Sequence, residues 1–171
     1  ESGFEIKVLP TWRPDKAMAV ENPGQFAAYV RTLGDAAGVR IDTFAGLCEA
    51  LQRRHDFFES NGCRLSDHGI EEFYAEDFDE ADIVGIFARV MDGETLSEDD
   101  VRRFKSKMLL VFGEMDAASD WTQQFHYGTI RNNNSRMMQS IGPDTGFDSI
   151  GEFATASACA RFLDRLDSAG K

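Results

Sequence analysis

The stretch Trp121–Arg136, WTQQFHYGTIRNNNSR, constrains the fold of this chain more than any other. Its first six residues alternate in the way that places successive side chains on opposite faces of a β-strand. The strand pattern ends at His126, and Gly128 opens a loop that carries Arg131 and three consecutive asparagines. A strand that ends in histidine and leads into such a loop is typical of the carboxyl edge of a sheet in α/β enzymes. A buried strand followed by a polar turn is the alternative, because asparagine favours turns by itself.

The chain contains two further strand patterns, and polar residues follow each of them. We predict strands at about residues 4–9, 63–67 and 121–126, with helices between them. Strands that alternate with helices form parallel sheets, because each helix returns the chain to the edge where the next strand begins. The sequence therefore predicts a parallel α/β fold. Three strands cannot close a barrel, which needs about eight strands and typically about 250 residues.

Helix start signals are clear along the chain. Asn22 before Pro23 predicts one N-cap, and either Asp42 or Thr43 is predicted to cap the next helix. Ser97 with Asp100 three residues later resembles a capping box. We therefore expect helices to begin directly after these three caps.

Two predicted helices lie between the second and third strands, which is one more than a simple crossover requires. We expect a helical insertion at about residues 75–118 within a single domain of 171 residues. The basic residues of its second helix, at positions 102, 103, 105 and 107, are predicted to form a solvated face. A last helix is predicted at about residues 154–166.

Arg13 stands between Pro10 and Pro14, just past the first predicted strand. Proline restricts its own backbone and that of the preceding residue, so the loop is stiff. An arginine held in this way is suited to bind an oxyanion. A surface arginine in an ordinary loop is the alternative.

Asp67 and His68 are adjacent at the end of the second predicted strand, so their side chains face opposite sides of it. At most one of them points into a site unless the chain bends at Gly69. We favour Asp67, which can accept hydrogen bonds from a sugar hydroxyl or position a base, and treat metal ligation by His68 as the weaker alternative. His55 lies on the apolar stripe of a predicted helix, and we expect a hydrogen-bonded histidine of the core or its boundary there, with metal or ligand binding as the weaker alternative.

The charge balance argues against several classes of partner. The chain has 18 basic and 30 acidic residues and a net charge of −12, which disfavours nucleic acid and anionic membranes. Its three cysteines are widely spaced and form no C-x-x-C pair, a pattern typical of a protein of the reducing cytoplasm. The chain contains no run of about 18 apolar residues, so the sequence predicts no membrane-spanning helix.

Four longer motifs carry a resemblance to a known family. They are PTWRPDK at residues 10–16, RLSDHG at 64–69, HYGTIRNNN at 126–134 and GPDTGFDSIG at 142–151. In this order and spacing they resemble the uronate isomerases, also called glucuronate isomerases, and the resemblance covers essentially the whole chain. It implies part of a (β/α)8 TIM barrel of the amidohydrolase-like superfamily, about strands three to five with their helices.

The resemblance also implies an activity and a cofactor. Family members interconvert D-glucuronate with D-fructuronate and D-galacturonate with D-tagaturonate, and they use a divalent metal, usually zinc. The resemblance implies that the family's His-x-His metal pair lies before residue 1 and that its Asp-x-Arg motif near the last strand lies after residue 171, so we expect the metal ligands outside this sequence. We further expect the chain to be an internal segment that is inactive alone. Its expected partners are a uronate sugar and the remainder of its own barrel, and a homo-oligomer is conceivable.

The chemistry of such an isomerase assigns roles to four residues. The enzyme must move a proton between C1 and C2 of an open-chain sugar while it holds the C6 carboxylate. Arg13 and Arg131 are the candidate substrate-binding residues, because guanidinium groups bind carboxylates in a bidentate manner. His126 and Asp67 are the candidate catalytic residues, and the resemblance places Arg13 and His126 in the family's active site. The alternatives are a metal-dependent hydrolase of the same superfamily and a non-catalytic acidic α/β module.

Overall fold

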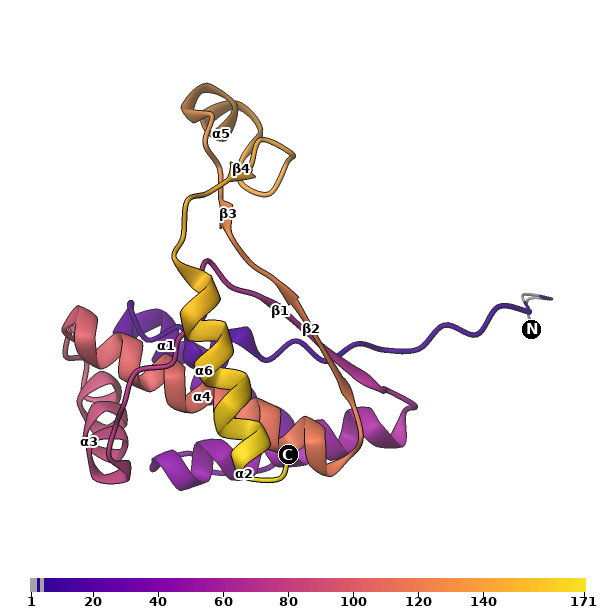
Figure 1. Ribbon diagram of the computed structural model, residues 1–171, viewed down its shortest axis with the longest axis vertical. Coiled ribbons are helices and arrows are strands. Elements are labelled where there is room, and N and C mark those ends of the chain that lie inside the picture. The colour runs from indigo at the N-terminus through magenta and orange to yellow at the C-terminus, as the bar shows by residue number, and fades with distance from the viewer. Residues whose placement is uncertain (1–2, 4) are drawn as a thin grey trace.

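Parallel strand pairing organises the centre of the molecule. The computed structural model describes residue 3 and residues 5–171. Strand β1 (Leu65–Gly69) pairs in parallel with β2 (Thr122–His126), in a register that places Gly69 opposite His126. On the other side of β1, Trp12 forms a parallel bridge with Ser66. Three segments therefore lie side by side in the order in which they occur along the chain (Figure 1).

The first predicted strand is wrong in its position. Residues 5–9 form no strand, and Ile6 and Val8 are 71% and 79% exposed, while residue 4 of that prediction lies outside the described residues. The ladder is made instead at Trp12, whose N–H donates to Leu65 O (3.2 Å) and whose carbonyl accepts from Asp67 N (2.8 Å). Within the part of the chain that the structure describes, no strand lies beside residues 5–9, whereas Trp12 is buried and pairs with β1.

The second predicted strand is displaced by two residues. It was expected at about residues 63–67 and is observed as β1, so Asp67, His68 and Gly69 lie inside the ladder and not beyond it. Pairing continues past the strand ends, because Ile70 N donates to His126 O (3.0 Å). The polar residues of this segment are thus held by main-chain hydrogen bonds.

The predicted helix caps are confirmed. Asn22 accepts from Gln25 N (3.0 Å) at the start of α1 (Pro23–Ala37), and Thr43 accepts from Gly46 N (3.1 Å) at the start of α2 (Phe44–Ser60). Ser97 accepts from Asp100 N (3.1 Å) at the start of α4 (Glu98–Ala118). The other helices are the 3-10 helix η1 (Asp15–Met18), α3 (Glu80–Met91), α5 (Ser135–Ile141) and α6 (Thr155–Ser168). None of the described helices is both long and apolar enough to span a bilayer.

A cluster of four phenylalanines joins the helices into one body. Phe26, Phe44, Phe87 and Phe104 come from α1, α2, α3 and α4 respectively, and all four are buried. Their rings meet edge to face, with centroids 5.8 to 6.3 Å apart. Such pairs add a specific geometry to the burial of large apolar surface. The cluster therefore fixes the helices on which the sheet rests.

Residues 127–153 form an arm that extends from this body (Figure 1). Strand β3 (Thr129–Ile130) pairs antiparallel with β4 (Ser149–Ile150), and none of residues 127–153 is buried. Two hydrogen bonds fold the loop back: Asn132 N donates to Asp148 Oδ1 (2.8 Å), and Asp144 N donates to Asn132 Oδ1 (3.0 Å). The asparagine run thus shapes the arm, with Asn132 in the left-handed region at φ 56°.

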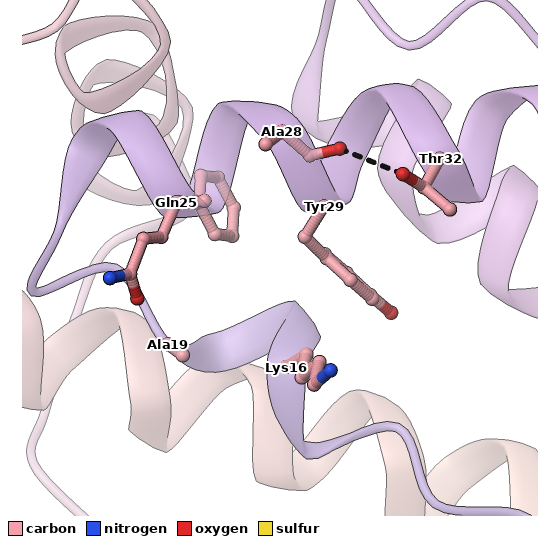
Figure 2. Close-up of a pocket in the computed structure, with 7 residues that line it drawn as sticks. Lys16, Ala19, Gln25, Ala28, Tyr29 and Thr32 are labelled. Atoms are coloured by element: carbon pink, nitrogen blue, oxygen red, sulfur yellow. Dashed lines mark hydrogen bonds between the residues drawn. The ribbon is translucent and has the colours of Figure 1, made fainter.

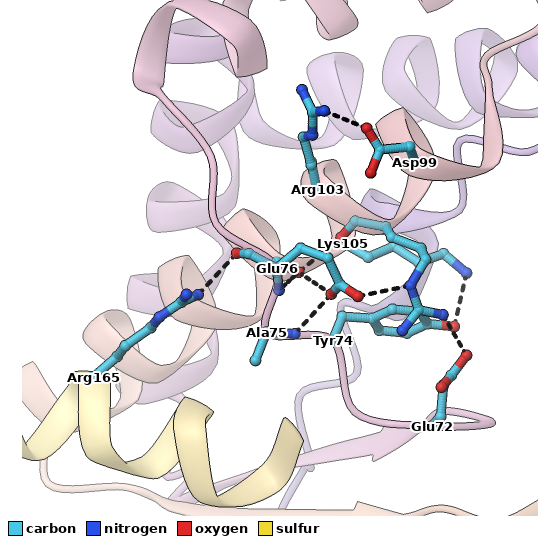
Figure 3. Close-up of polar contacts among 10 residues, drawn as sticks. Glu72, Tyr74, Ala75, Glu76, Asp99, Arg103, Lys105 and Arg165 are labelled. Atoms are coloured by element: carbon cyan, nitrogen blue, oxygen red, sulfur yellow. Dashed lines mark hydrogen bonds and ion pairs between the residues drawn. The ribbon is translucent and has the colours of Figure 1, made fainter. Parts of the chain in front are cut away.

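Charged side chains fasten the loop after β1 to α4 and α6 (Figure 3). Arg102 donates from Nη1 to Glu72 Oε1 (2.6 Å) and from Nε to Glu76 Oε1 (2.7 Å). Arg165 donates from Nη1 to the main-chain oxygen of Glu76 (2.9 Å). Burial alone would raise the pKa of Glu76, but hydrogen bonds and charge from Arg102, with a bond from Ser106, lower it below its ordinary value of 4.5.

The expected solvated face on α4 is wrong for Arg102, Lys105 and Lys107, the last of which is 16% exposed and paired with Glu80. Lys105 is buried and pairs with Glu21, and Arg102 is enclosed by the two glutamates of the loop. The helical periodicity of α4 shows which of its charged residues share a face. It does not show which loop from elsewhere in the chain covers that face.

We predict that Arg102→Gln removes a stabilisation of the fold that is present at neutral pH and lost in acid. The pKa of Glu76 is lowered in the folded state, so its stabilisation is present above 4.5 and is lost as the pH falls through the folded-state value. The free energy of unfolding, measured by urea denaturation, should be lower in the variant at pH of about 7, and the difference should shrink at about pH 3. Arg40→Gln, which breaks the exposed pair with Asp42, is the control and should be nearly neutral.

A second prediction concerns the phenylalanine cluster. Phe104→Ala should lower the free energy of unfolding by about 3–5 kcal/mol, because it leaves a cavity among buried rings. Phe57, which is 51% exposed on α2, provides the matched control, and Phe57→Ala should cost less than about 1 kcal/mol. Equal losses in the two variants would show that the cluster does not hold the helices together.

Candidate active site

Three of the predicted site residues meet at the carboxyl ends of the parallel segments. Arg13 Nη1 lies 3.5 Å from Asp67 Oδ2, and His126 Nε2 lies 2.8 Å from Asp67 Oδ1. Asp67 stands opposite Gln124 in the ladder, and His126 follows Gln124 by two residues, so their side chains share one face of the sheet. Strand pairing thus places Asp67 between an arginine and a histidine.

Arg131 joins this group from the arm. A Cβ atom at Gly69 would lie 2.4 Å from Arg13 Nη2 and 3.6 Å from Arg131 Nη2, so both guanidinium groups reach the same space beside Gly69. Asp148 holds the other side of Arg131 through Nη1 (3.1 Å). All four residues singled out from the sequence therefore lie together at one edge of the sheet.

The two arginines keep one amino group each available for a ligand. Arg13 is paired through Nε and Nη1, to Asp15 and Asp67, and Arg131 is paired through Nη1. Within residues 3 and 5–171, the Nη2 group of each arginine has no hydrogen-bond partner, and the side chains are 53% and 45% exposed. An incoming carboxylate can accept from both Nη2 groups, which is the strong, charge-assisted form of hydrogen bond.

A buried polar network lies behind this edge, on the opposite face of β1. His68 Nδ1 lies 2.9 Å from Asp15 Oδ1, and its Nε2 lies 2.9 Å from Ser66 Oγ. Ser66 donates to Asp116 Oδ2 (2.6 Å) on α4. Because both ring nitrogens of His68 are engaged and the ring is fully buried between Phe112 and Phe125, metal ligation by His68 is not supported.

Ser66, His68 and Asp15 follow one another as in a hydrolase triad, but they do not form a nucleophilic site. Ser66 is fully buried, and its single proton is donated to Asp116. No proton is left for His68 to remove, and no substrate can reach the hydroxyl group. The network is therefore structural support for the edge where Asp67 lies.

His55 lies in the core, as predicted. It is fully buried on α2, stacks on Trp121 with ring centroids 3.9 Å apart, and its Nε2 lies 3.2 Å from Asp116 Oδ1. Asp116 therefore ties α2 to β1 through His55 and Ser66. These contacts of Asp116 stabilise the sheet, and Asp116 is not part of the exposed site.

Asp15 and Asp116 are two further residues of this region that the sequence patterns above do not indicate. Asp15 directly follows Pro14 in the first motif, where it begins η1 and contacts both Arg13 and His68. Asp116 follows Phe112 by four residues on the buried stripe of α4. A lone carboxylate on an apolar stripe was the signal that could have indicated a buried partner.

One oxygen of the site lacks a hydrogen-bond donor. Asp67 Oδ1 is buried, and although His126 Nε2 lies 2.8 Å away, the two atoms are not oriented for a hydrogen bond. A buried acceptor without a donor is costly unless a ligand completes it. Among residues 3 and 5–171, however, no group of three histidine, cysteine or acidic side chains is arranged to hold a metal ion. The described residues thus do not form a metal site by themselves.

A separate pocket opens between η1 and α1, away from this edge (Figure 2). It has a volume of about 360 Å³ and is lined by Lys16, Ala19, Gln25, Phe26, Ala28, Tyr29 and Thr32. Burial, aided by the negative charge of Asp15, raises the pKa of Tyr29 to about 12, so this phenol stays protonated. None of the four predicted site residues lines the pocket.

Comparison with known proteins gives a consistent family. The family model described as glucuronate isomerase matches residues 1–171. The uronate isomerase of Phocaeicola vulgatus is 62% identical over 171 residues, and that of Cellvibrio japonicus is 46% identical over the same length. Each match covers 100% of this chain and 36% of the relative, so the chain spans about a third of the length of these relatives.

Solved structures agree with these matches. The crystal structure of uronate isomerase from Thermotoga maritima superposes with a TM-score of 0.85 at 33% identity, covering 94% of this chain and 36% of that one. Glucuronate isomerase from Caulobacter crescentus shares the fold, with a TM-score of 0.82 at 24% identity and coverage of 96% and 34%. The expected fold class, part of an α/β barrel, is confirmed by this likeness.

We predict that Ser66→Ala destabilises the fold from within the buried network. The change removes a donor from Asp116 and a partner from His68, and a buried polar atom left unpaired costs about 1–3 kcal/mol. Ser60→Ala, on the exposed end of α2, is the control and should change the free energy of unfolding by less than about 0.5 kcal/mol. Equal urea midpoints for both variants would show that the network does not support the sheet.

Proposed function

The chain belongs to the glucuronate isomerase family, and we propose that it contributes part of the active site of a uronate isomerase. The reaction converts D-glucuronate to D-fructuronate and D-galacturonate to D-tagaturonate. The observation that carries the proposal is the convergence of Arg13 Nη2 and Arg131 Nη2 beside Gly69, next to Asp67 and His126. Two guanidinium groups beside a carboxylate and an imidazole suit an anionic sugar better than they suit a neutral one.

We assign the C6 carboxylate of the substrate to the two arginines. The Nη2 groups are the atoms free to donate, while Asp15, Asp67 and Asp148 hold the other edges of the guanidinium groups. The ligand therefore meets donors that are already oriented, which reduces the entropy lost on binding. The net charge of −12 does not oppose this, because contacts at hydrogen-bond distance outweigh the screened field of distant charges.

We assign the proton transfer to His126 and Asp67. Isomerisation moves a proton between C1 and C2 through an enediol, so it needs a group that takes the proton and returns it. His126 is 53% exposed and can reach the substrate, while Asp67 Oδ1, 2.8 Å from Nε2, stabilises the ring when it gains a proton. Oδ1 itself is buried, so a substrate hydroxyl would reach this carboxylate through its exposed part, since the Asp67 side chain is 19% exposed.

We further propose that the divalent metal implied by the family, zinc, is held by residues outside positions 1–171. The described residues supply no group of three ligating side chains, so no step above is assigned to a metal. The exposed face of β2 and the apolar residues of the arm, such as Ile150 at 94% exposure, are the surfaces on which the remaining length of a relative would pack. Three free cysteines fit the proposed cytoplasmic location.

The test is Arg13→Lys in the protein expressed at the full length that its gene encodes. Lysine keeps the charge but loses the planar, two-donor contact, so kcat/KM for D-glucuronate should fall about ten- to hundred-fold, or about 1.5–3 kcal/mol of transition-state binding. Arg40→Lys, on an exposed loop, is the matched control and should leave kcat/KM unchanged. The proposal fails if the Arg13 variant turns over D-glucuronate as fast as the parent, or loses only thermal stability.

A further inference from the structure

Gly69 is a glycine for reasons of space, because nothing in its backbone requires one. It lies inside the parallel ladder of β1 and is not among the glycines with positive φ, so any L-residue can adopt its conformation. A glycine within a strand weakens pairing and commonly marks a place where another group approaches closely. At Gly69 the approaching group is Arg13, because a Cβ would stand 2.4 Å from its Nη2 atom.

Asp15 holds the same guanidinium group from its other edge. Its Oδ2 accepts from Gly69 N (2.8 Å) and lies 3.4 Å from Arg13 Nε, while its Oδ1 lies 2.9 Å from the buried His68. Asp15 is therefore fixed to β1 at two points. Asp67, on the same strand, holds Arg13 Nη1.

We propose that Gly69 and Asp15 are positioning residues that set Arg13 for the substrate carboxylate. Asp15 and Asp67 fix the Nε and Nη1 sides of the guanidinium group, and the absent side chain at Gly69 leaves room for Nη2 beside Arg131. Position 69 thereby decides whether both arginines reach one carboxylate. The inference rests on the proposed function, since it assigns how the same site recognises the anionic end of a uronate.

Gly69→Ala separates positioning from folding. The three atoms nearest to the added methyl group all belong to the ends of the flexible Arg13 and Arg131 side chains, so Arg13 should turn away while the strand stays intact. The melting temperature should therefore be unchanged or slightly higher, because alanine restricts the unfolded chain more than glycine does. In the protein at its full encoded length, KM for D-glucuronate should rise about ten-fold with kcat nearly kept, the pattern of lost uniform binding.

A double-mutant cycle with Arg13→Lys adds a readout that a general structural defect would not reproduce. Lysine has no Nη2 atom for the methyl group to displace, so Gly69→Ala should cause little further loss in that background. Gly85→Ala is the matched control, since a Cβ there meets nothing within 4 Å and Gly85 is not among the positive-φ glycines. Asp15→Asn should also raise KM, with some loss of stability because it touches buried His68.

The outcomes are distinct. Three results would each overturn the inference. They are an unchanged KM in Gly69→Ala, losses that add fully to those of Arg13→Lys, and a fall in melting temperature that accounts for the lost activity. If the parent protein shows no uronate isomerisation, the proposed function fails, and the nitrogen-15 resonance of Arg13 Nε then tests positioning alone. That resonance should move in Gly69→Ala and stay in place in Gly85→Ala, and the reverse result rejects the role of Gly69.

Discussion

The ladder that joins Trp12, β1 and β2 is the constraint on which the rest of the structure depends. Main-chain hydrogen bonds bring three segments into parallel register, although more than fifty positions separate each from the next along the chain. Parallel strands end at the same edge of a sheet. Three positions are therefore brought together: the residue after Trp12, a residue within β1 and the last residue of β2. Arg13, Asp67 and His126 meet for this reason, and no contact between their side chains is needed to bring them there.

Successive side chains of β1 point to opposite faces of the strand, so its polar residues have two different roles. Ser66 and His68 face the helices and are fully buried, while Asp67 between them faces the open edge. The buried pair is satisfied by Asp116 and Asp15, which avoids the cost of unpaired polar groups in a core of aromatic rings. The strand that carries the site is thus held from behind by side chains that no substrate touches.

The chemistry of the edge follows from how its charges are held. Each arginine is anchored by carboxylates on one side, and its Nη2 group has no partner among residues 3 and 5–171, so the cations are oriented and available to a ligand. The helical body behind the sheet, joined by its four phenylalanines, gives the edge a rigid base. This combination of a fixed scaffold and half-exposed donors is what binding an anionic sugar requires, and it supports placing part of a uronate isomerase active site here.

Local patterns in the sequence determined the features that depend on near neighbours. N-caps at Asn22, Thr43 and Ser97 act within one helical turn, so they could be predicted. The alternation of Trp121 to His126 placed β2 and its two faces correctly, since a strand exposes every second residue. The core position of His55 followed from the apolar stripe around it. Motif resemblance, which sums many positions, indicated the family together with Arg13 and His126, while Asp67 and Arg131 were chosen from the chemistry of the reaction; the catalytic and binding roles of all four stay proposals.

Only the tertiary structure decided which distant groups become partners. Residues 5–9 have strand-like composition but no strand beside them in the described part of the chain, whereas Trp12, whose indole is buried, pairs with β1. Lys105 carries the pattern of a solvated residue, and the loop before α3 and Glu21 enclose it. Asp15 reaches His68 across 53 positions, and Arg131 reaches the space beside Gly69 only because the arm folds back. Such contacts depend on the path of the whole chain, and a local pattern carries no information about a partner that lies far away in sequence.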